Sequence, residues 1–334
     1  MLTLIAALSL ATPASCAGLD IADCAATEHG IVIGAGEDAA EYLTVIDEAA
    51  VRFSRYFSAP EQPTAVVIGG QIEPGLNAEL QRAGFRPLPW LTNADKRAFA
   101  IEQMRSQFEE QLGHLGETMV EQAMAQALPQ LDAALPQQSV EKASGALAHE
   151  IAHGFLISLW GRPAEARDDG KIGYGSAGPD WLDELAAVTA ENDILLDQRR
   201  EAFPDAWTAE ASEEALYPLR DYLSMDHPLL ERVAMTREAA REQGSSVRVF
   251  SGAEAEELLG ESNPVRFYVQ SLAFADFLIE TSGDETVLGR IALALRVGSF
   301  EQYLAVNDDG LPRSVDALEA AWKAWGDARA SRIS

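Results

Sequence analysis

The sequence predicts an α+β, mostly helical fold, in which a small N-terminal α/β lobe over residues 25–92 precedes a helical region over 93–334. In the first region, the β-branched runs "HGIVIGAG" (29–36) and "TAVVIGG" (64–70) end in glycines and are typical of strands. Between them, apolar residues recur at helical spacing over 38–57. Apolar residues make up 47% of the 334 positions, which is enough to form a substantial interior.

The first 17 residues resemble a secretory signal peptide. The apolar run from Leu2 to Ala11 is too short to span a bilayer and is followed by Pro13 and small residues, although no Lys or Arg precedes it. The alternative is a buried N-terminal helix. We expect an exported protein, located in the periplasm or outside the cell.

The chain has two cysteines, Cys16 and Cys24, which lie close to the expected cleavage point. Cleavage after Ala14 would keep both, and an oxidising compartment could then join them. Cleavage after Ala17 would remove Cys16 and leave a single thiol.

Beyond the first lobe, the pattern predicts helices separated by polar loops. Residues 71–93 are rich in proline and glycine and predict turns. Ser139 is placed to cap the helix expected over 139–160. The helices expected here cover 139–160, 180–200, 229–243, 263–282, 284–297 and 314–330. The pattern over 93–128 is also helical and is expected to form a lid or an inserted hairpin. No later stretch reaches about 18 uninterrupted apolar residues, so we expect no membrane span.

The charge balance argues against two classes of partner. Acidic residues outnumber basic ones by 53 to 25, which gives a formal charge of −28. The resulting field repels nucleic acid and anionic membranes, so neither is an expected partner.

The stretch "ALAHEIAHGFL" (146–156) carries the strongest chemical signal. His149 and His153 are four residues apart, so a helix presents both on one face, where they can bind one zinc ion. Glu150 would project beside the metal, where it can act as the general base that activates a water. The alternative is an amphipathic core helix that happens to carry histidines.

A catalytic zinc site needs a third protein ligand and an open position. Leu156 and Leu159 stand where a metzincin has Gly and His. The stretch "PDWLDELAAV" (179–188) instead resembles the second zinc helix of gluzincins of the peptidase MA-like group, Trp-Leu-x-Glu-Gly-x-Ala. Trp181, Leu182, Glu184 and Ala187 match, while Leu185 replaces the glycine.

The resemblance extends over roughly 139–326 and includes the C-terminal stretch "FYVQSLAFADFLIETSGDETVLGRIALALRVGSFEQYL" (267–304). It implies a zincin-like catalytic domain, one Zn²⁺ per chain and Glu184 as third ligand, with the zinc helices near 139–160 and 180–200. Asp183 is a candidate partner for a ligand histidine, while Glu191 would lie too far along the same helix for the same ion.

Hydrolysis also needs a donor for the developing oxyanion. In the resembling family a tyrosine takes this role, and Tyr268 holds the matching position. Tyr268 could equally be a packing residue, and His227 is an alternative donor.

The function expected from these residues is that of a secreted or periplasmic zinc-dependent peptidase. It would hydrolyse bonds of a peptide or protein substrate with a zinc-activated water. One alternative is an exported, non-enzymatic binding or structural protein on a gluzincin scaffold. Another is a zinc hydrolase that acts on a non-peptide amide.

Overall fold

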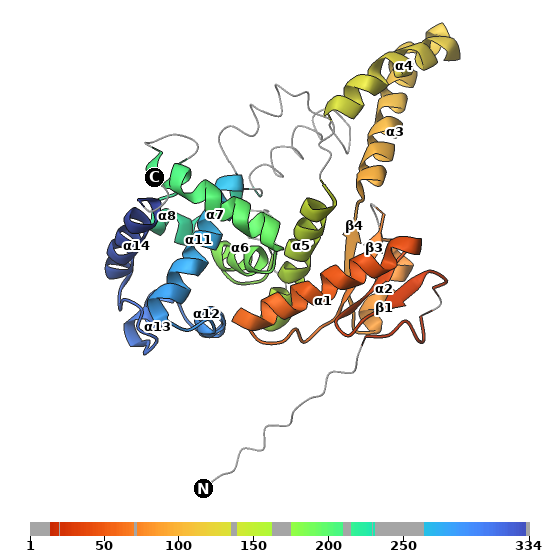
Figure 1. Cartoon of the computed structure of the whole chain (residues 1–334). Coiled ribbons are helices and arrows are strands. Elements are labelled where there is room, and N and C mark those ends of the chain that lie inside the picture. Colours follow the sequence, from red (N-terminus) through yellow and green to blue (C-terminus); the bar gives the residue numbers. More distant parts are fainter. Residues whose placement is uncertain are drawn as a thin grey trace.

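The computed structural model describes residues 14–19, 21–69, 72–134, 139–161, 175–209, 215–228, 230 and 264–331. Most of the expected signal peptide and the helix expected over 229–243 lie outside these residues. The α+β, mostly helical architecture is confirmed: a four-stranded sheet near the N-terminal end adjoins a larger helical body (Figure 1).

The sheet has the strand order β1-β2-β3-β4. The short β1 (Cys24–Ala26) pairs antiparallel with β2 (Gly30–Ile33). β3 (Thr64–Ile68) runs parallel to β2, and β4 (Arg86–Trp90) runs parallel to β3. All four residues of β2 are buried, as expected for a strand covered on both faces.

The turns expected over 71–93 are in part wrong, because this stretch contains α2 (Pro74–Arg82) and the edge strand β4. Pro74 occupies the first helical turn, where a missing N–H costs nothing. Within β4, the Arg86 amide donates to Pro63 and the Trp90 carbonyl accepts from Gly69, so these positions face β3. The alternate positions, Pro87 and Pro89, face away from β3, where a strand tolerates proline.

The sheet and the helical body share one apolar core. Helix α1 (Ala39–Tyr56), preceded by the short 3₁₀ turn Gly36–Asp38, buries Ile46, Ala49 and Phe53 in that core. Phe53 meets Phe155 of α5 (Val140–Trp160) at a ring-centroid distance of 5.5 Å. Ser139 caps α5 through the Lys142 amide, as predicted.

The helical pattern over 93–128 forms two helices in a projecting hairpin, which is one of the two arrangements expected from the sequence (Figure 1). These are α3 (Asn93–Leu112) and α4 (Glu117–Ala134), joined by a 3₁₀ turn over Gly113–Leu115. Gly116 ends the turn at φ 102°, a backbone conformation that favours glycine.

The single helix expected over 180–200 is also two helices, α6 (Asp180–Thr189) and α7 (Asp193–Thr208). The chain turns at 190–192, and the side chain of Asn192 caps α7 by accepting from the Leu195 amide. The break redirects Glu191, with consequences for the site described below.

The remaining helices complete the body. An aromatic cluster that includes Phe203, Trp322 and Trp325 joins α7 to the C-terminal helix. These helices are α8 (Leu219–Ser224), α11 (Pro264–Ser282), α12 (Val287–Leu295), α13 (Phe300–Val306) and α14 (Val315–Ala330). Among the described residues, no helix combines the length and the apolar character needed to cross a membrane.

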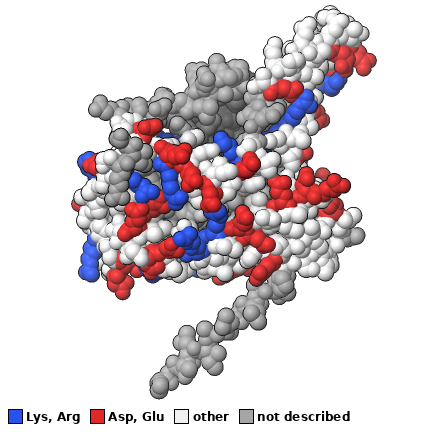
Figure 2. All heavy atoms as spheres, in the orientation of Figure 1, with Lys and Arg blue, Asp and Glu red and all other residues white. Residues whose placement is uncertain are grey.

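At the N-terminal end, Cys16 and Cys24 form a disulfide, with their Cα atoms 6.0 Å apart. Acidic side chains outnumber basic ones over the face shown in Figure 2, in line with the charge of the sequence.

Candidate metal centre

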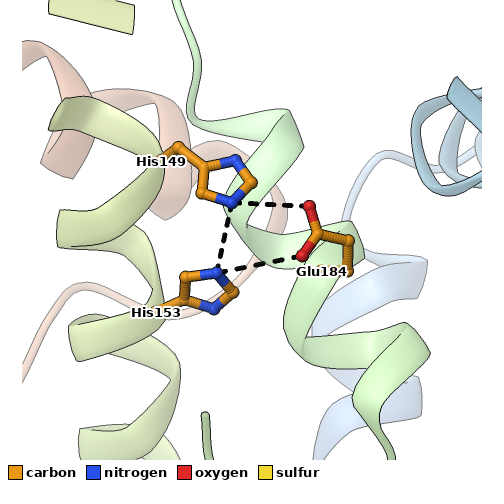
Figure 3. Close-up of side chains that lie close together, drawn as sticks. All are labelled: His149, His153 and Glu184. Atoms are coloured by element: carbon orange, nitrogen blue, oxygen red, sulfur yellow. Dashed lines mark hydrogen bonds and ion pairs between the residues drawn. The ribbon is translucent and has the colours of Figure 1, made fainter. Parts of the chain in front are cut away.

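Two helices bring three candidate ligands together. His149 and His153 extend from α5, and Glu184 faces them from α6 (Figure 3). The two Nε2 atoms lie 3.2 Å apart, while Glu184 Oε1 lies 3.4 Å from His149 Nε2 and Oε2 lies 3.9 Å from His153 Nε2. All three residues are buried, and their ligand atoms lie within 4.8 Å of one another. This group can hold a metal ion.

The placement follows from local structure. In α5, the i, i+4 spacing puts both imidazoles on the face that packs against α6. In α6, every residue from Trp181 to Thr189 is buried, so Glu184 is enclosed on all sides. A carboxylate is found in such surroundings only when it is paired or bound to a metal.

The charges of this group are strongly coupled. Burial alone would lower the pKa of His149, but the carboxylates of Glu184 and Glu191 outweigh burial and raise it to about 9. Burial and the neighbouring His149 lower the pKa of His153 to about 3. Burial would raise the pKa of Glu184, yet His149 and His227 hold it at about 2. The pocket therefore favours an ionised Glu184 beside a protonated His149.

Glu150 follows His149 directly on α5 and is exposed. Desolvation by the surrounding protein raises its pKa, the charge of His149 opposes this, and Glu184 adds to the rise. Water therefore reaches this carboxylate, although protein surrounds much of it. Glu150 is not one of the three residues whose ligand atoms lie within 4.8 Å of one another.

The partner of His149 is Glu191, which corrects the role expected for Asp183. His149 Nδ1 lies 2.8 Å from Glu191 Oε1. Because a carboxylate only accepts, Nδ1 carries a proton, and Nε2 faces the centre, where it can bind a metal once its own proton is displaced. Arg199 holds the far side of Glu191, with Nε 2.6 Å from Oε2. The contact between Glu191 and His149 could not be predicted from the sequence, because it depends on α6 ending at Thr189.

Asp183 serves a different contact. Its carboxylate accepts from the amide of Ser176 at 2.8 Å and from the Ser176 hydroxyl at 2.7 Å. Gly175, at φ 58°, lies so close that a Cβ there would approach Asp183 Oδ1 to 2.3 Å. Burial raises the pKa of Asp183 to about 8, despite the two Ser176 donors. Asp183 thus secures the chain entering α6.

Both candidate oxyanion donors lie near the group. The Tyr268 ring, on α11, has its centroid 5.5 Å from that of His149, and the Arg199 guanidinium lies over the Tyr268 ring at 4.8 Å. His227 is fully buried, with Nε2 3.2 Å from Glu184 Oε2. The histidine is therefore directed at the candidate ligand, while the tyrosine flanks the group from the His149 side.

No family model, no curated protein and no solved structure matches this chain.

Proposed function

We propose that the protein is an exported zinc-dependent peptidase. The carrying observation is the spacing of the candidate ligand atoms of His149, His153 and Glu184. Atoms about 2.0–2.1 Å from a tetrahedral ion lie about 3.3 Å from one another. The two Nε2 atoms are 3.2 Å apart, and each lies 3.4 or 3.9 Å from one of the two carboxylate oxygens of Glu184, which is close to that value.

The donor set favours zinc over other divalent ions. Two imidazoles and one carboxylate suit zinc, whereas magnesium and calcium prefer oxygen ligands. The two Nε2 atoms lie 3.2 Å apart, a separation that either a shared proton or a bound cation can bridge. Three protein ligands leave a fourth position open, as in catalytic zinc sites.

The surrounding residues fit hydrolysis of an amide. Bound zinc would lower the pKa of water to about 7 and polarise a carbonyl oxygen. Glu150 accepts the proton of the attacking water and passes it to the leaving amine. The Tyr268 hydroxyl donates to the oxygen that becomes negative, and Glu191 keeps His149 in the tautomer that binds metal.

Export is supported by the disulfide between Cys16 and Cys24, because such bonds persist in oxidising compartments. The bond also favours cleavage of a signal peptide before Cys16, as after Ala14, over cleavage after Ala17.

The test uses the purified mature protein and a mixed peptide library. We expect about one zinc per chain and cleavage that stops when a chelator is added. Glu150→Gln serves as the matched control that binds zinc without turnover. Zinc binding without cleavage of any peptide would favour a binding protein or a hydrolase of another amide, and a chain that binds no zinc would refute the proposal.

A further inference from the structure

Arg86 crosses the metal-binding helix directly beside a candidate ligand. It begins β4, and its side chain lies over Gly154, the residue after His153 on α5. A Cβ at 154 would approach Arg86 Cδ to 2.8 Å and Nε to 3.1 Å. Glycine at this position therefore leaves the room that the arginine occupies.

The Arg86 guanidinium has no hydrogen bond or ion pair with the residues that the structure describes, although the side chain is half-buried. The other half-buried cations of those residues have a carboxylate or an aromatic ring as partner. They are Arg52, Lys96, Arg105, Arg199, Arg200, Arg266, Arg290 and Arg329. In a chain with 53 acidic residues, a half-buried cation without a hydrogen-bonded carboxylate is conspicuous, because burying such a charge costs free energy.

The charge of Arg86 affects the pKa of a candidate ligand in the metal centre. After burial and the charge of His149, Arg86 is among the groups that lower the pKa of His153. Burial lowers the pKa of Arg86 itself, and Asp183 opposes that effect. This agrees with the contact between the Arg86 side chain and Gly154, the residue after His153. Asp183 itself is bonded to Ser176.

We propose that Arg86 determines specificity by binding a carboxylate of the substrate beside the metal centre. This inference rests on the proposed peptidase function. A guanidinium binds a carboxylate through two parallel hydrogen bonds, and the bound substrate would supply a directly bonded carboxylate. The carboxylate belongs either to the C-terminus of the peptide or to an Asp or Glu side chain near the cleaved bond.

The test uses one N-acetylated peptide sequence that the enzyme cleaves, in four versions. The C-terminus is free or amidated, and the residue next to the cleaved bond is Glu or Gln. We expect the wild-type enzyme to favour one carboxylate-bearing version by about 10- to 100-fold in kcat/KM. The version that carries the preference identifies the source of the carboxylate.

Arg86→Gln should abolish this preference while neutral versions are still cleaved, and Arg86→Lys should retain part of it. Arg82→Gln is the matched control, since Arg82 is exposed on α2 and the change in net charge is the same. A second readout is calorimetric. Zinc-loaded Glu150→Gln should bind the favoured peptide more tightly than its neutral version, and adding Arg86→Gln should remove the difference.

Equal kcat/KM for all four versions would overturn the proposal, as would an Arg86→Gln enzyme that is slower on every version by one factor. If Arg86→Gln does not fold, the proposal is tested by two other results. These are the preference of the wild-type enzyme for a carboxylate-bearing version and the reduction of that preference in Arg86→Lys. Absence of cleavage of every peptide would instead refute the proposed function, and the calorimetric comparison would then decide the role of Arg86.

Discussion

At the scale of single residues, the first question is whether Glu150 acts on the reaction or on the metal. It lies outside the three-residue group, so Glu150→Gln should leave zinc content and folding unchanged. Turnover should fall by at least about 10²–10⁴-fold, because one group accepts and returns the proton. Metal analysis and peptide kinetics on one preparation measure both. Zinc loss in this variant would place Glu150 among the ligands.

Tyr268 offers a test of the oxyanion role. Tyr268→Phe removes one hydroxyl and almost no volume, so the ring contact with His149 should persist. If the hydroxyl contacts only the oxyanion, kcat should fall by about 10²–10³-fold with little change in KM. Tyr303→Phe is the control, because the Tyr303 hydroxyl donates to Asp309, which follows α13 in the chain and is not part of the three-residue group. An unchanged kcat would leave Tyr268 as a packing residue and make His227 the next variant to measure.

Glu184 and Glu191 separate binding of the metal from orientation of a ligand. Glu184→Ala should reduce zinc content sharply, because it removes one of three candidate ligand atoms. Glu191→Gln should still reach one zinc per chain but with about 10- to 100-fold weaker affinity, since it perturbs the partner of His149. Competition with a chelator of known affinity measures both. Full zinc affinity in Glu184→Ala would exclude Glu184 from the site.

Residue identities revealed the candidate ligands, but the contacts around them depend on the path of the chain. His149, Glu150, His153 and Glu184 could be proposed from spacing and from a family resemblance. The partnership between Glu191 and His149 could not, because a continuous helix over 180–200 would have carried Glu191 away from that histidine. Arg86 gave no signal in the sequence, since β4 was hidden in a stretch that proline and glycine made resemble turns.

At the scale of helices, the packing of α5 rests on a glycine. At Gly145, a Cβ would approach Leu195 Cδ1 of α7 to 2.6 Å and Asn192 Oδ1 to 2.8 Å. Gly145→Ala should therefore lower the free energy of unfolding by about 1–3 kcal/mol, although alanine favours helices. Gly75 of α2 has no atom within 4 Å of its virtual Cβ, so Gly75→Ala should be neutral or stabilising by up to about 1 kcal/mol. Urea denaturation of both variants measures the contrast, and equal effects would contradict it.

The helices also show which patterns sequence reasoning handles well. Ser139 marked the start of α5 because a cap and an apolar face coincide there. The break after α6 was missed, because helical spacing continues across 190–192. There Asn192 caps α7 locally by accepting from the Leu195 amide, and it also donates to the Glu141 carbonyl of α5 at 2.6 Å.

At the scale of the whole molecule, the disulfide links the position of signal-peptide cleavage to the free energy of unfolding, because only a mature chain that keeps Cys16 can form it. We expect a mature chain that keeps Cys16, with an intact mass that rises by two hydrogens on reduction. The double variant Cys16→Ser, Cys24→Ser should be less stable by about 2–3 kcal/mol, as expected for closing so short a loop. Reduced wild-type protein should match the double variant in urea denaturation. A mature chain beginning after Ala17 would contradict this prediction.

The prolines of β4 affect whether the sheet can pair with sheets of other molecules. An exposed edge strand can form backbone hydrogen bonds with a strand of another molecule, and repeated pairing of this kind leads to aggregation. An added strand could donate hydrogen bonds to the carbonyls of Pro87 and Pro89. These prolines have no N–H to donate in return, so regular strand pairing cannot form at those positions. On the opposite flank, β1 has three residues and begins at a disulfide-bonded cysteine. Fibre growth by strand addition is thereby discouraged at both flanks of the sheet.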